Sequence, residues 1–400
     1  MKKFFFSFLM MAMSTMLITS CLGDDNDNNN NKPVDVVTTT GLYVINNGTW
    51  NQNNGSLTYF DYETLSAQQV LNGPVGLGDT PNDAYTLGDT IFVVGSSENT
   101  IFVVNKKNFS IIGRVNTVVE MGEAEGYSPR HITGYNNKVY FTTYGGYVGE
   151  LDAKTLTLTN KCQVGSGPEG LAIGGSTSDP MLYVANSDYS YGNASISKIP
   201  LSSGTLGTPQ TITHEKIRNP QEIVPVGDDF YFLDWGYYDE NWNQMEAGLY
   251  YYNKGTVTKI VADATGIGTG IVYLSGYPVG YNIVTFNAPY GATGKPTFSK
   301  VNTYTNPQSA LPLNLSGDSD FEIVSPAAIG IDPITGNIVI ASRSIDPDTG
   351  FASSTLPGYA NMYRNDISSS EAIYIQGTHF TTGIEPHKIG FTIGTKTVTY

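Results

Sequence analysis

The sequence predicts an all-β fold, a seven-bladed β-propeller closed by pairing of its C-terminal strand with its N-terminal blade. Three observations support this prediction. A short phrase containing proline recurs roughly every 51 residues. Each repeat reads as four short strands separated by turn residues, which is the composition of a propeller blade. No apolar period of 3.6 residues follows the first twenty residues, so helices should be scarce.

The repeated phrase places a proline after polar or small residues and before a short, partly apolar strand. It occurs as TPNDAY at Pro81, SPRHIT at Pro129, GPEGLAI at Pro168, NPQEIV at Pro220, SPAAIG at Pro326 and EPHKIGF at Pro386. The stretch TGIGTGIVYLSG near Thr265 fills the one missing place without a proline. Seven repeat starts result, and therefore seven blades.

The strands that follow each phrase are clearest between Ile91 and Val115, where IFVVGS, TIFVVN and SIIGRV are separated by turn residues. The domain opens at GLYVINNG, beginning at Gly41, with what reads as a second strand, because no proline phrase precedes it. The phrase at Pro386 has no companion strands after it. We therefore expect the C-terminal strand to complete the N-terminal blade, which removes the exposed sheet edges.

The N-terminus predicts export. Residues 1–20 combine a basic start, an apolar stretch and small residues before Cys21, which is the pattern of a signal peptide. The tetrapeptide ending at Cys21 resembles the lipobox of bacterial lipoproteins, which implies cleavage before this cysteine and lipidation of its sulfur. Residues 21–39, acidic and rich in asparagine, are predicted to be a disordered tether, and residues 40–400 the propeller.

Net charge limits the classes of binding partner, and cysteine content limits the source of stability. The net charge of −15 makes nucleic acid and anionic lipid surfaces poor partners and favours a neutral or cationic small ligand. Contact with a membrane is expected through the lipid anchor only. Cys162 is the only other cysteine, so the mature domain can form no internal disulfide and must derive its stability from its core.

Two segments carry a resemblance to a known family. LYVAN at Leu182–Asn186 and the stretch from Ile91 to Val115 resemble the YVTN repeat of YncE-like propellers. The layout of lipobox, acidic tether and GLYVINNGTWNQNNGSLTYFDYETL resembles surface lipoprotein propellers found beside TonB-dependent transporters, including those that capture cobalamin. This resemblance implies an outer-membrane, lipid-anchored, cell-surface location, cobalamin as ligand and a TonB-dependent outer-membrane transporter as partner.

Aromatic residues gather in the loops between second and third strands, which all return to the face where the innermost strands begin. Clustered loop aromatics favour binding of a flat or ring-shaped ligand, a sugar or a protein, although packing of loop residues on one another is the alternative. The predicted ligand-binding aromatics are Trp50, Tyr144, Tyr189, Tyr191, Trp235, Tyr237, Trp242 and Tyr290, with Tyr147, Tyr238, Phe351 and Tyr359 in the same loops.

Polar residues just after the prolines predict a second ring at the mouth of the central channel. Arg130, His131 and His387 are the predicted ligand-binding members, joined by Asn82, Asp83, Glu169, Gln221, Glu222 and Lys388. Such a ring supplies the few polar groups that orient a ligand in an apolar pocket. The alternative is that these side chains satisfy backbone groups of the loops.

The sequence contains few motifs that would indicate an enzyme. The four histidines show no zinc spacing, and no GxSxG elbow occurs. His131 and His387 could converge across the channel, as histidines do in metal-dependent lyases, but no adjacent ligand set supports a metal. Residues 346–350 begin like a calcium loop, yet Pro357 stands where its last acidic ligand belongs. The sequence predicts no catalytic residue and no cofactor, and calcium at residues 346–350 stays open as an alternative.

The function expected from the sequence is therefore capture of a small nutrient at the aromatic face and its transfer to a transporter in the same membrane. A protein-interaction scaffold that docks on a membrane partner is the alternative, and a metal-dependent lyase or hydrolase is a third. Glycan binding also fits aromatic loops. A propeller fold by itself does not choose among these functions.

Overall fold

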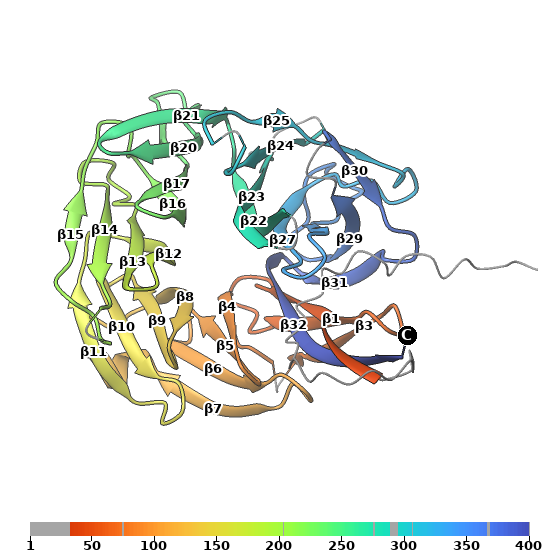
Figure 1. Ribbon diagram of the computed structural model, residues 1–400, viewed down its shortest axis with the longest axis horizontal. Coiled ribbons are helices and arrows are strands. Elements are labelled where there is room, and N and C mark those ends of the chain that lie inside the picture. The colour runs from red at the N-terminus through yellow and green to blue at the C-terminus, as the bar shows by residue number, and fades with distance from the viewer. Residues whose placement is uncertain are drawn as a thin grey trace, which may run out of the picture.

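The computed structural model describes residues 33–73, 76–202, 204–274, 277–288, 295–305, 307–365 and 369–399. The predicted signal peptide, Cys21, most of the tether and Tyr290 lie outside the described residues. Seven sheets stand around a central opening as the blades of a disc (Figure 1). The predicted fold class, an all-β seven-bladed propeller, is confirmed.

Each blade has four main strands, which we number from the central opening outward. The innermost strands of blades 1 to 7 are β32 (Pro386–Thr399), β4 (Pro81–Leu87), β8 (Pro129–Tyr135), β12 (Pro168–Ser176), β16 (Pro220–Val226), β22 (Gly266–Leu274) and β27 (Pro326–Ile331). The second strands are β1 (Pro33–Asn46), β5 (Thr90–Gly95), β9 (Lys138–Thr143), β13 (Asp179–Asn186), β17 (Asp229–Asp234), β23 (Tyr277–Asn287) and β28 (Ile338–Ser342).

The outer half of each blade follows the same order. The third strands are β2 (Ser56–Asp61), β6 (Thr100–Asn105), β10 (Tyr147–Asp152), β14 (Ser195–Pro200), β20 (Gly248–Asn253), β24 (Thr297–Asn302) and β29 (Pro357–Asn365). The outermost strands are β3 (Ser66–Leu71), β7 (Ile111–Asn116), β11 (Leu158–Gln163), β15 (Gln210–Ile212), β21 (Thr256–Ala262), β25 (Leu311–Pro312) and β30 (Glu371–Tyr374).

A few elements are added to this plan. Blade 5 carries a small hairpin of β18 (Tyr237–Tyr238) and β19 (Gln244–Met245), and blade 7 is widened by β26 (Asn314–Ser316) and β31 (Phe380–Ile384). The single helix in the described part of the chain is α1 (Thr117–Met121), between blades 2 and 3, and helices are scarce as predicted. No helix among the described residues is long and apolar enough to cross a membrane.

Blade 1 is built from both ends of the chain. Gly41–Asn46 of β1 pairs with Pro386–Thr392 of β32 on one side and with β2 on the other, so the C-terminal strand closes the ring as expected. Residues 33–39 continue the pairing with β32 as a two-stranded ribbon. Residues 33–39, predicted as the end of the tether, thus belong to strand β1, because β32 is long enough to pair with them.

The core is divided among the gaps between neighbouring blades, and each of the seven gaps holds one cluster of buried apolar side chains. Strand β5 shows why the inner strands read as continuous apolar runs. Ile91 and Val93 face blade 1, whereas Phe92 and Val94 face blade 3. Side chains alternate across a strand, so a sheet covered on both faces needs apolar residues at every position.

The proline phrases form one repeated turn at the start of the inner strands. In blade 3 the backbone N–H of Tyr144 donates to Ser128 O at 3.1 Å, and corresponding bonds precede the prolines of blades 1, 2, 4, 5 and 7. A register shift follows each of these prolines. Such a bulge turns additional side chains of the inner strand toward the central opening, which places the residues after each proline at the channel mouth.

Candidate functional site

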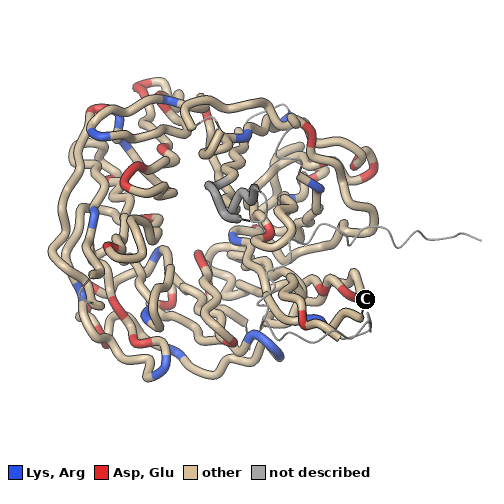
Figure 2. The backbone as a smooth tube through the Cα atoms, viewed as in Figure 1, with Lys and Arg blue, Asp and Glu red and all other residues tan. Residues whose placement is uncertain are grey.

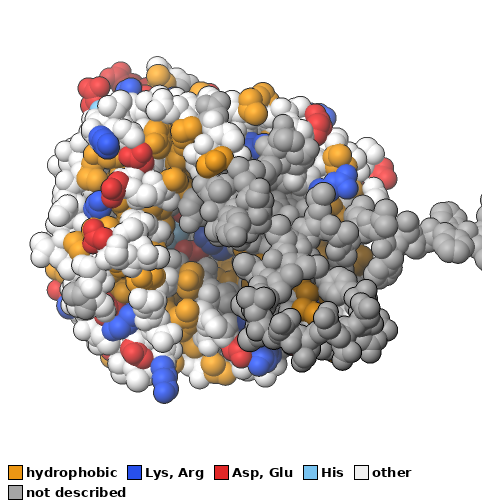
Figure 3. All heavy atoms as spheres, in the orientation of Figure 1, with side chains coloured by type: hydrophobic (Ala, Val, Ile, Leu, Met, Phe, Trp, Pro, Cys, Tyr) orange, Lys and Arg blue, Asp and Glu red, His pale blue; other side chains and the backbone are white. Residues whose placement is uncertain are grey.

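One face of the disc carries the start of every inner strand together with the loops that join second to third strands, and we call it the mouth face. Acidic and basic positions both lie along the inner edge of the blades (Figure 2). The disc is hollowed at its middle, where acidic, basic and histidine side chains are visible (Figure 3). The residues that follow the prolines supply a connected group of these charges.

We define the mouth cluster as the six interacting side chains Asp83, Arg130, His131, Glu169, Glu222 and Lys388. His131 lies at its centre: its Nδ1 is 3.2 Å from Asp83 Oδ2, and its Nε2 is 3.3 Å from Glu169 Oε2. Glu222 approaches His131 Nδ1 to 3.8 Å. Arg130 Nε donates to Glu169 at 2.9 Å, and Lys388 Nζ donates to Asp83 at 2.9 Å.

The cluster stabilises the charged forms of His131, Asp83 and Glu169. Burial alone would lower the pKa of His131, but Glu222, Asp83 and Glu169 outweigh it and raise that pKa to about 10. Burial likewise opposes ionisation of Asp83, yet Lys388 and His131 hold its pKa below the ordinary value. The pKa of Glu169 is lowered by His131 and Arg130 against the same cost of burial. Three cations therefore face three anions, and the cluster is neutral overall.

His387 behaves differently from His131. Burial, together with the positive charges of His131 and Arg130, lowers its pKa to about 3, so the imidazole is neutral at physiological pH. The sequence-based hypothesis required the two histidines to converge on a metal ion. Within the described residues, however, no group of His, Cys, Asp and Glu side chains is arranged to hold a metal ion.

Two predicted aromatics join the mouth cluster directly. The guanidinium of Arg130 lies 4.8 Å from the ring centre of Tyr144, a cation–π distance. The Tyr144 and Tyr189 rings are 5.5 Å apart, and the Tyr189 hydroxyl donates to Glu169. Both rings remain partly open to solvent, with exposed fractions of 37% and 44%. This edge of the mouth thus offers aromatic surface next to fixed charges.

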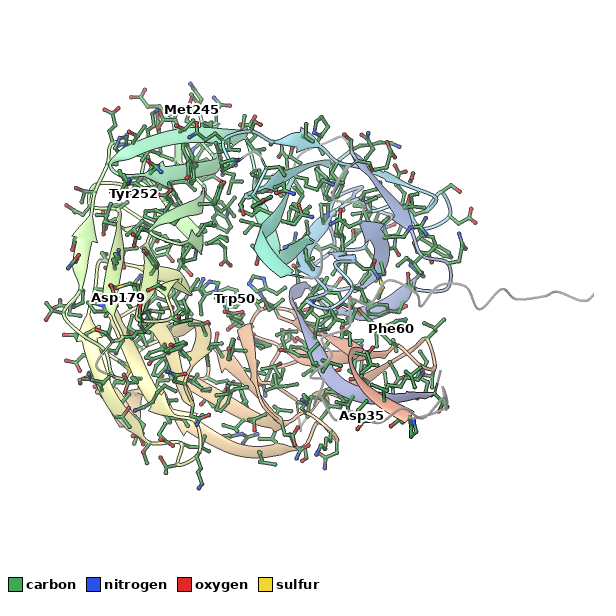
Figure 4. All side chains as sticks on the ribbon, in the orientation of Figure 1. Asp35, Trp50, Phe60, Asp179, Met245 and Tyr252 are labelled. Atoms are coloured by element: carbon green, nitrogen blue, oxygen red, sulfur yellow. The ribbon has the colours of Figure 1, made fainter. Side chains whose placement is uncertain are left out.

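Trp50 supplies aromatic surface on another side of the mouth. It is 73% exposed and lies beside the central opening in Figure 4. The residues on either side of Trp50 hold its loop in place: Thr49 Oγ1 donates to Ser354 O at 2.8 Å, and the Asn51 N–H donates to Asp79 at 3.0 Å. The indole is therefore presented to solvent by a fixed loop.

The remaining tryptophans belong to a separate structure, residues 235–247 of blade 5, which we call the blade 5 arm. Trp235 donates from Nε1 to Thr265 O at 3.1 Å, and Arg218 lies 5.2 Å from the ring of Tyr237. Trp242 is 83% exposed and contacts Tyr238 of the same arm. In Figure 4 Met245 of this arm lies toward the outer edge of the disc. The sequence predicted a single aromatic rim. The structure has two sets of aromatic residues: Trp50, Tyr144 and Tyr189 at the mouth, and those of the blade 5 arm.

One predicted ligand-binding residue, Tyr191, remains to be placed, and one ion pair on the mouth face was not predicted from the sequence. Tyr191 is only partly exposed and stands in a left-handed turn with φ of 62°, where its backbone N–H donates to Asp188 O. Arg343 and Glu385 form an unpredicted ion pair on the mouth face. Glu385 stands immediately before a proline, whereas the predicted ring consists of residues after the prolines.

The side chains that line the channel beneath the mouth are mostly aliphatic. A cavity of about 410 Å³ reaches from Glu222 and Lys388 past Ile223, Ile267 and Ile329 to Phe391. Apolar walls with a few polar groups at one end are the usual composition of a small-molecule site. The candidate site is therefore the mouth cluster, its flanking aromatics and the upper part of this channel.

In the candidate calcium loop, the first acidic residue takes part in the turn itself. The Asp346 carboxylate accepts hydrogen bonds from the backbone N–H groups of Asp348 and Thr349, at 2.9 and 3.1 Å. These bonds close a tight turn in which the carboxylate caps its own loop. Asp346 thus stabilises a turn of blade 7 through these hydrogen bonds.

Comparison with known proteins supports the fold. No protein-family model matches the chain, and no curated protein sequence matches it. Among solved structures, a hypothetical selenium-binding protein from Sulfolobus tokodaii superposes with a TM-score of 0.62 at 12% identity, over 90% of this chain and 94% of that one. Hydrazine synthase from Kuenenia stuttgartiensis gives 0.54 at 11% identity, over 80% and 95% of the two chains.

The WD40 repeats of RRP9 match with a TM-score of 0.51 at 8% identity, over 85% of this chain and 86% of that one. Identities this low carry the fold and not the activity. Together with the sheet order, these likenesses identify the chain as a seven-bladed β-propeller.

Proposed function

We propose that this protein is a lipid-anchored binding protein of the outer-membrane surface, which captures a small nutrient at the mouth face and hands it to a TonB-dependent transporter. Cobalamin is the first candidate ligand, from the resemblance of the N-terminal layout to cobalamin-capturing lipoproteins. The anchor would be lipid on Cys21. The protein acts as a binding module in this proposal and performs no chemistry on its ligand.

The observation that carries the proposal is the one-sided distribution of exposed aromatic side chains. Among the described residues these side chains lie on mouth-face loops, with Tyr304 as the exception on the opposite face: Trp50, Tyr127, Tyr144, Tyr189, Trp235, Tyr238, Trp242, Phe321 and Phe351. Exposing large rings is unfavourable in water, so their collection on one face favours a surface that is covered when a ligand binds.

The mouth cluster adds a restriction on the ligand. Because its cations and anions are already paired, it offers no excess charge to an ionic ligand. It offers instead fixed hydrogen-bonding groups beside aromatic rings, which suits a large flat molecule with an uncharged polar periphery. The corrin ring of cobalamin with its fringe of amides has this chemistry.

Isothermal titration with cyanocobalamin tests the proposal. We expect saturable heat, and we expect Trp50→Ala to weaken binding about tenfold or more, since truncating a central aromatic contact typically costs about 2 kcal/mol or more. Tyr304→Ala removes an exposed ring of the opposite face and serves as the matched control, with unchanged affinity. Absence of heat at micromolar protein would exclude cobalamin as the ligand.

A second candidate function rests on the blade 5 arm. Trp242 and Tyr238 are exposed on the arm with their ring centres 6.4 Å apart, and large exposed rings of this kind are typical anchors of protein interfaces. A scaffold that docks through this arm on a transporter should co-purify with it after mild detergent extraction, without added ligand. Retention of the partner by Trp242→Ala and Tyr238→Ala variants would argue against this function.

A further inference from the structure

A second cavity opens on the face opposite the mouth, between blades 1 and 2. Its volume is about 530 Å³. The walls come from the far ends of β1, β4 and β32 and from the turns after β4, β6 and β27: Tyr43, Ala84, Tyr85, Thr86, Gly88, Lys106, Pro333, Gly390, Phe391 and Ile393. This volume lies within the range of ligand-binding pockets.

The walls of this cavity favour an apolar ligand. Most of the lining is aromatic or aliphatic, and the hydroxyl of Tyr43 is already bonded to Thr86 Oγ1 at 2.8 Å. Tyr85 donates its hydroxyl to Gly134 O at 3.1 Å. The polar atoms of these walls are thus satisfied within the protein. Pro333 and Phe391 also line the channel cavity, so an extended occupant could continue toward the channel.

One positive charge stands at the edge of the cavity. Lys106 Nζ is held by Gly88 O at 2.8 Å and Ile393 O at 3.3 Å, and its side chain is only 15% exposed. Its acidic neighbour Asp89 is 3.5 Å away, largely exposed, and also paired with Lys107 at 3.0 Å. Two ammonium groups thus share one carboxylate, in a chain whose net charge is −15. The excess charge at this edge is positive.

We propose that this cavity binds an amphiphile of the fatty-acid class, with its acyl chain against Tyr43, Phe391 and Ile393 and its carboxylate at Lys106. The carboxylate takes the place of the exposed, shared Asp89 beside the Lys106 ammonium. This site is independent of the mouth face and of the function proposed for it.

The test compares two neighbouring lysines by isothermal titration of the purified protein with decanoate, below its micelle concentration. Lys106 lines the cavity, whereas Lys107 pairs with the same aspartate but lies outside the lining. We expect Lys106→Gln to weaken decanoate binding about tenfold or more, as loss of a charge-assisted hydrogen bond does. Lys107→Gln should weaken it by less than about threefold, the smaller effect of an exposed charge.

A second ligand shows whether the lysine recognises the carboxylate. Decan-1-ol has the same chain without the charge, and we expect the unsubstituted protein to prefer decanoate and Lys106→Gln to lose this preference. Trp50→Ala should leave decanoate binding unchanged, which separates this site from the mouth. Absence of decanoate binding, equal effects of the two lysine substitutions, or an unaltered preference in Lys106→Gln would overturn the proposal.

Discussion

His131 is the residue on which the mouth cluster depends, because it contacts carboxylates on three blades: Asp83, Glu169 and Glu222. Its charged form is stabilised by the fold, since its pKa rises from 6.5 to about 10. A group whose pKa is raised in the folded state stabilises the fold fully below its unfolded pKa and loses that contribution as pH rises through the folded value. For His131 this window runs from about pH 6.5 to about pH 10.

We therefore predict that His131→Ala lowers the free energy of unfolding at pH 7 by about 3 kcal/mol, the low end for breaking a buried ion pair. The low end applies because Arg130 and Lys388 still neutralise the two buried carboxylates. The variant should also lose less stability than the unsubstituted protein between pH 7 and pH 10. Urea unfolding across this range is the measurement, with His214→Ala as a control outside the cluster. Parallel pH profiles would contradict the assignment.

At the scale of elements, the turn before each inner strand is the unit that builds the site. The residue before the proline is in a left-handed conformation at Thr80, Ser128 and Glu385, with φ between 49° and 54°, and at Gly167 with φ of 56°. Only glycine adopts this conformation without strain. Three blades thus hold an unfavourable residue where blade 4 has the favourable one.

This comparison gives a paired prediction. Ser128→Gly should raise the free energy of unfolding by up to about 1 kcal/mol, because relief of the left-handed strain exceeds the entropy cost of glycine. Gly167→Ala should lower it by about 1–3 kcal/mol, since the added Cβ would also lie 2.9 Å from the Tyr189 ring and 3.0 Å from Ser187 Oγ. Thermal and urea unfolding report both changes; a destabilised Ser128→Gly variant would show that the serine side chain is needed there.

The sequence predicted this element in part. Proline spacing located the inner strands, including β22, whose glycines at 268 and 270 pack against Ile329 and Ile331 with no room for a Cβ. The bulge after each proline could not be predicted from the residue pattern, because it depends on how the inner strand is aligned with the second strand. The ion pair of Arg343 and Glu385 was missed for a related reason: it joins residues from two different repeats within blades 7 and 1.

The division of the aromatic residues also lay beyond the sequence. Loop membership correctly indicates which face a residue reaches, but not its distance from the axis. Trp50 stands on an anchored loop beside the opening, whereas Trp242 belongs to the β18–β19 hairpin, whose Met245 lies toward the outer edge of the disc in Figure 4. The length of an insertion therefore decides whether an aromatic residue joins the mouth or forms a separate surface.

At the scale of the whole molecule, ring closure by β32 leads to a prediction about truncation. A chain ending at Glu385 loses β32 and leaves one edge of β1 unpaired, and we expect it to aggregate or to expose a long apolar strand. A chain ending at Gly394 keeps the pairs of Gly41–Asn46 and should stay monomeric. Size-exclusion chromatography with light scattering distinguishes them; a monomeric, folded Glu385 truncation would show that β32 is not required for closure.

The ribbon of residues 33–39 paired with the end of β32 also has a mechanical consequence. A pull on the chain before Pro33 acts along β1, which is bonded to β32 on one edge and, from Gly41, to β2 on the other. The hydrogen bonds along both edges then share the load in shear, and Thr39 adds a bond of 2.6 Å to Asp332 of blade 7. Tension from an anchored N-terminus would thus be spread over two blades before it could peel a single strand.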